Sequence, residues 1–142
     1  AKDYVRMMWM ILQADEAEDW VIATGTTTTI RDFVKMAFLH VGVELEFKGS
    51  GLNEKAIIKS CNNEKYQLEI GKEILSIDSK YFRPSEVDLL IGDPTKAKTK
   101  LGWELEYDLP SLVKDMMQSD LKLVLKDQFL SDNGYETPNY YE

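Results

Sequence analysis

The stretch TIRDFVKMAFLHVGVELEFKG, residues 29–49, decides the fold because it joins a helical pattern directly to a strand pattern. Thr29, with an acidic residue three positions later, is typical of a helix N-cap, and Gly42 is typical of a helix end. Residues 43–48 then alternate apolar with charged side chains, which predicts a half-buried strand. The helix between them carries an apolar stripe at three- and four-residue spacing: Ile30, Phe33, Val34, Ala37, Phe38 and Val41.

Outward from this unit, helical periodicity predicts two further long helices, at 2–14 and from Leu109 to about Lys126. The apolar face of the first helix consists of Val5, Met8, Trp9 and Leu12. We expect Met8 and Trp9, with Met10, to lie in the core or against another part of a longer protein. The alternative, for a truncated chain, is an exposed apolar patch that drives self-association. The buried side of the last helix is predicted to carry Leu112, Val113, Met116 and Val124.

The remaining segments are shorter. Apolar runs predict strands at 20–23 and 73–78, and Pro94 predicts the first turn of a short helix over 94–101. The Gly- and Asn-rich residues 49–72 fit either a long loop or a hairpin. The alternation of helices and strands indicates an α/β fold, with one domain over 1–130 and a mobile tail over 131–142.

Composition limits the function classes. The chain has 142 residues, 44% of them apolar, and a net charge of −8, so no basic excess favours nucleic acid or an anionic membrane. The one cysteine, Cys61, cannot form an internal disulfide, which suggests a cytosolic or redox-indifferent protein. With His40 as the one histidine, a zinc site is not expected either. No apolar run approaches the roughly 20 residues that span a membrane.

The sequence contains no phosphate-binding loop of the G-x-G-x-x-G or G-x-x-x-x-G-K-[ST] kind, and no Tyr-x-x-x-Lys pair. A self-contained dehydrogenase would need both parts. We therefore assign no catalytic, cofactor-binding or metal-binding residue within this chain. Because a helical pattern starts almost at Ala1, we also expect the chain to be a portion of a longer protein.

The segment YFRPSE, residues 81–86, carries the candidate ligand-binding residues. Pro84 fixes its own φ and favours an extended Arg83, so the guanidinium could meet a phosphate or carboxylate with little entropy left to lose. Glu86 could accept hydrogen bonds from a ribose diol. The alternative is a local surface ion pair between Arg83 and Glu86, which is common and contributes little.

Other notable residues have structural interpretations. Asp93 is expected to cap the short helix, and Trp103 to pack against that helix from outside. The alternating lysines of 94–101 indicate a solvated face, and Arg31 is expected to be solvated or to pair with Asp32, unless it faces a nucleotide or a neighbouring subunit.

Four linked motifs carry a family resemblance. AKDYV, VIATG, RPSEV and GDPTKAK occur in this order, and the last is followed by LGW. Together they resemble the C-terminal part of the GDP-mannose 4,6-dehydratase family, within the extended short-chain dehydrogenases/reductases. The GDPTKA…LGW piece alone is shared by several nucleotide-sugar epimerases and dehydratases.

The resemblance implies a fold and a function. It implies the substrate-binding portion of an enzyme that converts GDP-mannose to GDP-4-keto-6-deoxymannose with NADP, on the route to GDP-fucose. It also implies that Arg83 and Glu86 contact the GDP moiety, and that the Rossmann half with the catalytic residues lies outside this chain. We expect the complete enzyme to be a cytoplasmic homo-oligomer and this chain alone to be inactive. Alternatives are a portion of another nucleotide-sugar epimerase or reductase, or a non-catalytic nucleotide-binding module.

Overall fold

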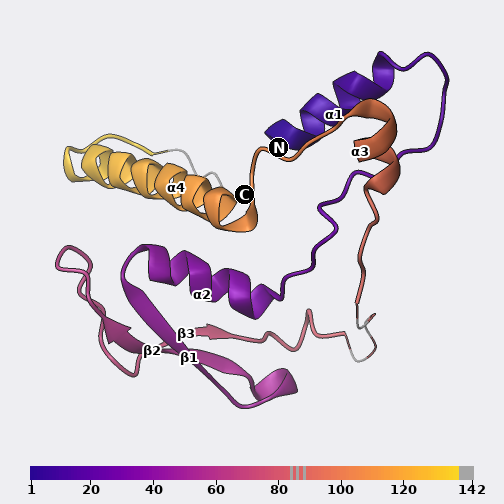
Figure 1. The fold of residues 1–142 in the computed structure, drawn as a ribbon. Coiled ribbons are helices and arrows are strands. Elements are labelled where there is room, and N and C mark those ends of the chain that lie inside the picture. The colour runs from indigo at the N-terminus through magenta and orange to yellow at the C-terminus, as the bar shows by residue number, and fades with distance from the viewer. Residues whose placement is uncertain (84, 86, 88, 138–142) are drawn as a thin grey trace.

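The computed structural model describes residues 1–83, 85, 87 and 89–137. The described residues form four α-helices, one short 3-10 helix and a three-stranded antiparallel sheet (Figure 1). The α/β expectation is therefore confirmed, with every strand pair antiparallel. In chain order the elements are α1 (Lys2–Leu12), α2 (Ile30–His40), β1 (Val43–Lys48), η1 (Gly51–Asn53), β2 (Lys55–Cys61), β3 (Glu73–Ser76), α3 (Thr95–Leu101) and α4 (Leu109–Asp132).

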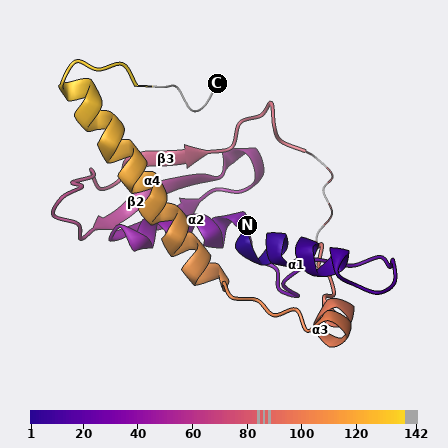
Figure 2. The same ribbon diagram turned by 90° about the horizontal axis from the view of Figure 1, so that it is seen from above.

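The sheet, α2 and α4 form three stacked layers. Helix α2 contacts both β1 and α4, and it lies between the sheet and α4 (Figure 1). Seen from above, α4 crosses obliquely over α2 and the sheet, whereas α1 and α3 lie to one side (Figure 2). The chain thus has a layered part and a smaller side part made from its first helix and its third.

The 29–49 stretch folds as its pattern predicts. Thr29 accepts a hydrogen bond at its side-chain oxygen from the amide of Asp32, at 3.1 Å, so one free N–H of the first turn is satisfied. Gly42 follows the helix with φ of 76°, a left-handed conformation that glycine adopts without strain. All members of the predicted apolar stripe are at least half-buried except Ile30, which is exposed.

Residues 49–72 contain a hairpin strand. β2 pairs antiparallel with β1, beginning with Lys55 opposite Lys48, and the register shifts once, between Glu44 and Leu45. β3 pairs antiparallel with the other edge of β2. Of the two alternatives for this segment, the hairpin is confirmed. Its connection needs Gly49, because a Cβ there would lie 2.2 Å from the carbonyl oxygen of Asn53.

A second core cluster holds the side part together. Met7 of α1, Ala97 of α3 and Trp103 are almost fully buried against one another. Gly102 ends α3 in the left-handed conformation, with φ of 63°, and this turn directs Trp103 back into the cluster. The expectation that Trp103 packs against this helix is therefore confirmed by its contact with Ala97, and the indole is in addition a central core side chain that meets Met7 of α1.

Asp3 joins α1 to the segment between α3 and α4. Its carboxylate accepts hydrogen bonds from the amides of Glu106 and Tyr107, at 3.0 and 3.1 Å, and its backbone oxygen accepts one from the Trp103 indole, at 3.1 Å. The residue is 8% exposed. Residues about 100 positions apart are thus tied together just before α4 begins.

Several predicted elements differ in extent. Residues 20–23 form no strand; they run extended beside residues 90–93, and a Cβ at Gly92 would lie 2.5 Å from that of Ala23. The strand prediction was wrong because an apolar run becomes a strand only where a ladder partner forms. Helix α1 and strand β3 each end two residues before the predicted boundary.

Helix α4 differs from its prediction in length and in buried face. It continues to Asp132, into the predicted tail, whose residues 138–142 lie outside the described part of the chain. Val113 is buried and Leu112 half-buried, as predicted, but Met116 and Val124 are exposed. The long helix presents a narrower face to α2 than its apolar residues suggest. None of the described helices is both long and apolar enough to cross a membrane.

Candidate functional site

The predicted ligand-binding segment begins just after β3. Asp78 turns the chain there: its side-chain oxygen accepts a hydrogen bond from the Lys80 amide at 2.8 Å, and its carbonyl accepts one from the Tyr81 amide at 3.1 Å. The Lys80 ammonium lies 5.3 Å from the centre of the Tyr81 ring. Arg83 follows outside any helix or strand, and it is exposed. A cation and two aromatic rings, of Tyr81 and Phe82, are thus presented on an accessible loop.

Only part of the predicted site can be placed. Arg83 belongs to the described residues, whereas Pro84 and Glu86 lie outside them. The predicted restraint of Arg83 by Pro84 and the predicted diol contact of Glu86 therefore remain predictions.

After the loop, the chain enters α3 through Asp93. Its carboxylate accepts hydrogen bonds from the hydroxyl and the amide of Thr95, at 2.5 and 2.9 Å. These bonds lower the pKa of Asp93, because they stabilise the ionised form. Asp93 thus satisfies a free N–H of the first turn, as predicted, although Pro94 precedes the helix rather than opening it.

The α3 lysines are engaged in contacts rather than simply solvated. The ammonium groups of Lys96 and Lys100 lie 2.7 and 2.8 Å from carboxylate oxygens of Glu18. Hydrogen bonds from Lys100 and Lys96 lower the pKa of Glu18 from its ordinary 4.5 to about 2. The Lys96 ammonium also lies 4.7 Å from the centre of the Trp20 ring. Both lysine side chains remain solvated, at 41% and 55% exposure, as expected. The sequence did not predict their ion pairs, because the partner carboxylate is distant in sequence.

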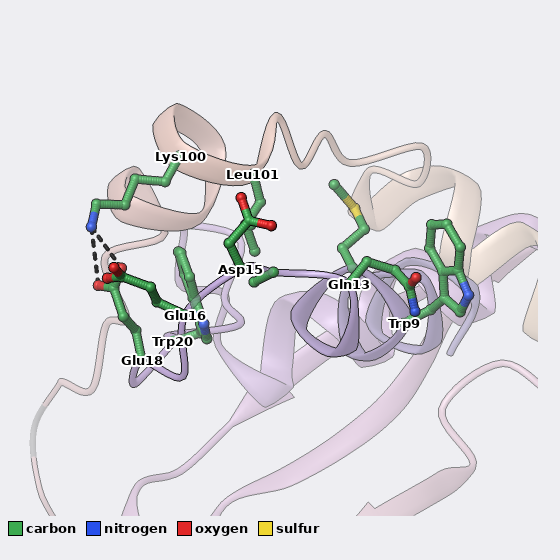
Figure 3. A pocket seen from close by; sticks show the side chains of 10 residues that line it. Trp9, Gln13, Asp15, Glu16, Glu18, Trp20, Lys100 and Leu101 are labelled. Carbon is green, nitrogen blue, oxygen red and sulfur yellow. Dashed lines mark hydrogen bonds and ion pairs between the residues drawn. The ribbon is translucent and has the colours of Figure 1, made fainter.

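An open cavity of about 530 Å³ lies between the end of α1 and α3 (Figure 3). Trp9 and Trp20 contribute aromatic surface, and Lys100 and Glu18 meet at its edge (Figure 3). The indole nitrogen of Trp20 is buried without a hydrogen-bond partner among the described residues. Arg83 does not line this cavity. One signal for it in the sequence is the acidic run directly before Trp20.

A second hollow lies at the start of α2, but its cation is already paired. The Arg31 guanidinium forms an ion pair with Glu54, whose side chain is 15% exposed, and it lies 5.6 Å from the centre of the Phe47 ring. The expected partner, Asp32, instead bonds to the Thr29 hydroxyl. Arg31 therefore joins α2 to the hairpin connection, which is a structural role.

The glycine that leads into α3, Gly92, has its open side filled by the Ala23 methyl, so a pyrophosphate could not approach the backbone there. Among the residues that the structure describes, no group of three His, Cys, Asp or Glu side chains could hold a metal ion. Cys61 is a free thiol, which donates a hydrogen bond to the Tyr66 carbonyl at 3.1 Å.

Comparison with known proteins gives consistent results. Residues 1–116 match the family model for GDP-mannose 4,6 dehydratase. A GDP-mannose 4,6-dehydratase of Vibrio cholerae serotype O1 is 46% identical over 136 residues, which is 95% of this chain and 36% of the relative. The Yersinia enterocolitica protein is 44% identical over 137 residues, 96% of this chain and 37% of the relative. The human protein is 44% identical over 124 residues, 87% of this chain and 31% of the relative.

The chain therefore spans about a third of the length of the relatives it matches. The matched residues include α1, the whole layered sheet, the loop with Arg83, and α3. Since the family model covers residues 1–116 of 142, the chain belongs to the GDP-mannose 4,6-dehydratase family.

Proposed function

We propose that this chain is the substrate-binding portion of a GDP-mannose 4,6-dehydratase, which converts GDP-mannose to GDP-4-keto-6-deoxymannose. The observation that carries the proposal is the extent of the similarity. Proteins with this name in bacteria and animals are 43–46% identical to the chain over 85% or more of its length. A resemblance restricted to the GDPTKA…LGW piece would support only a broader class of nucleotide-sugar enzymes.

Within the proposed site, Arg83 binds the pyrophosphate of the GDP moiety. Its exposure on the loop after β3 makes the guanidinium accessible, and its planar donors match phosphate oxygens in pairs. Tyr81 and Phe82 lie beside it in sequence and offer ring faces to a guanine base. Glu86 is proposed to accept hydrogen bonds from the ribose hydroxyls.

We further propose that the redox chemistry resides in other parts of an extended short-chain dehydrogenase/reductase. The cofactor of the complete enzyme is then NADP, bound together with the catalytic residues outside this chain. The absence of a G-x-G-x-x-G loop from the sequence supports this division. The complete enzyme is proposed to be a cytoplasmic homo-oligomer. The chain alone should form no keto sugar from GDP-mannose and NADP.

Calorimetric titration of GDP into the purified chain tests the site. A hydrogen bond to a charged group contributes about 1.5–3 kcal/mol, so Arg83→Ala should weaken GDP binding by roughly ten- to a hundredfold. Lys80→Ala is the matched control: it removes a cation from the same loop and should change the affinity by no more than about twofold.

UDP provides the second comparison, because a GDP-specific site should bind it more weakly. Equal GDP affinity in the wild-type and Arg83→Ala proteins would contradict the proposal, as would an equal loss in Lys80→Ala.

A further inference from the structure

The loop that carries Arg83 starts from a fixed point of the sheet. β3 is paired with β2 up to Ser76, which lies opposite Lys55. The next residue, Ile77, is half-buried and lines a hollow of about 360 Å³ together with Val34 of α2. The chain therefore has a defined position and direction at the point where the loop begins.

The other end of the loop is also held. The Leu90 carbonyl accepts a hydrogen bond from the Thr27 hydroxyl at 3.3 Å. Two residues later, the backbone at Gly92 passes so close to Ala23 that a Cβ on the glycine would lie 2.5 Å from the alanine Cβ. Both ends of the loop thus lie beside the start of α2, and the path between them depends on the turns within the loop.

One turn directs the chain as it leaves the sheet. The Asp78 side chain accepts the Lys80 amide at 2.8 Å, and the Asp78 carbonyl accepts the Tyr81 amide at 3.1 Å. The two bonds make an Asx turn inside a β-turn, with aspartate at the first position, where it is favoured. The Asp78 carboxylate therefore fixes the direction of the residues that follow.

The turn shortens the free path from the sheet to Arg83. Five residues of fully extended chain reach roughly 17 Å, so without the turn Arg83 can lie that far from Asp78. In a β-turn the first and fourth Cα atoms lie within about 7 Å of each other. Only Phe82 then separates the end of the turn from Arg83. The position of the guanidinium thus depends mainly on this turn.

We propose that Asp78 is a positioning residue for the GDP site, because its turn aims the loop so that Arg83 meets the pyrophosphate. This inference rests on the proposed function, and it assigns Asp78 no contact with GDP. An oriented guanidinium loses less conformational freedom on binding, so disruption of the turn should weaken GDP binding about three- to tenfold. Since a carboxylate repels a pyrophosphate, removal of its charge alone should not weaken binding.

Calorimetric titration of GDP into three Asp78 variants of the chain tests the proposal. Asp78→Ala removes the acceptor and should weaken binding about three- to tenfold. Asp78→Asn keeps an oxygen in the same place without the charge, so its affinity should stay within about twofold of the wild type. Asp78→Glu keeps the charge, but its longer side chain does not reproduce the Asx turn, so it should bind as weakly as Asp78→Ala.

Ser79→Ala is the matched control. Ser79 is exposed, as Asp78 is, and lies at the second position of the same turn. Its replacement should leave the affinity for GDP unchanged. Because both residues are exposed, every variant should also keep the urea midpoint of the wild-type chain. A lowered midpoint with unchanged GDP affinity in Asp78→Ala would give the turn a structural role only and would overturn the proposal.

The double variant Asp78→Ala/Arg83→Ala shows whether Asp78 acts through Arg83. It should bind GDP as Arg83→Ala does, because no guanidinium is left to position. Additive losses would overturn the inference, as would an Asp78→Asn protein that binds as weakly as Asp78→Ala. Wild-type affinity in Asp78→Ala beside a weakened Arg83→Ala would also overturn it and would leave the proposed function standing. Wild-type affinity in Arg83→Ala would refute the proposed function, and this inference with it.

Discussion

Replacing Asp3 with alanine should strongly destabilise the packing of α1 against the segment before α4. The Asp3 carboxylate accepts two backbone hydrogen bonds, from Glu106 and Tyr107, within a site that is 8% exposed. Alanine would leave both amides without their acceptor in a largely dry environment. Leaving a buried donor unsatisfied costs about 1–3 kcal/mol. Because these two amides are only partly buried, about 1–2 kcal/mol for each gives an expected loss of about 2–4 kcal/mol.

Urea unfolding monitored by circular dichroism measures this loss. With an m-value of about 2 kcal/mol per M, the expected loss lowers the midpoint by about 1–2 M. Asp3→Asn has nearly the same volume, but its amide group can accept at one oxygen only and presents N–H to the second donor. It should therefore lose a substantial part of the same free energy.

Glu104→Ala removes an exposed carboxylate from the same loop and serves as the control, with an expected change within about 0.5 kcal/mol. A loss of less than about 0.5 kcal/mol for Asp3→Ala would refute the reasoning. So would an Asp3→Asn protein as stable as the wild type, because the charge would then contribute nothing.

Three further perturbations test other parts of the structure. The pKa of Glu18 is lowered to about 2, so its ion pairs stabilise the fold fully above pH 4.5, the pKa of the unfolded chain, and this contribution should fade as the pH falls toward 2. The melting temperature of Glu18→Gln should lack that part of the dependence on pH. Equal dependence of the melting temperature on pH in the variant and the wild type would contradict the pairing. Thr29→Ala removes the α2 cap and should cost about 1 kcal/mol in urea unfolding, whereas Thr28→Ala should be neutral; equal effects would argue against capping. Gly49→Ala places a Cβ 2.2 Å from a backbone carbonyl and should destabilise the hairpin more than Gly71→Ala, which meets only the strain of φ at 87°; the reverse order would rule out the close contact as the cause.

The local elements of the layered part could be predicted from the sequence. The α2 stripe, its Thr29 cap, the Gly42 end and the β1 alternation are all properties of neighbouring residues, and each is present in the structure. The partner strand β2 was less certain, because its Asn- and Gly-rich flanks carry no regular period. Its pairing depends on β1, so only the long-range register settled the hairpin.

The candidate site divides in a similar way. Its sequence context and a family resemblance predict Arg83 as a ligand-binding residue, and the structure adds that this residue is exposed on the loop after β3. The cavity between α1 and α3 could not be predicted, because Trp9, Trp20 and Lys100 are brought together by the Trp103 cluster. The Glu18 contacts with two α3 lysines join residues about 80 positions apart, so no local pattern reports them.

The sequence by itself determined the family, the principal helices and one apolar face of α1. Short-range periodicity and linked motifs contain that information. Only the tertiary structure decided which apolar residues are covered: Trp103 enters the core through the turn at Gly102, while Trp9 and Met8 remain outside. The physical reason is that periodicity records a side chain's preference to leave water, whereas burial also requires a second surface to pack against it.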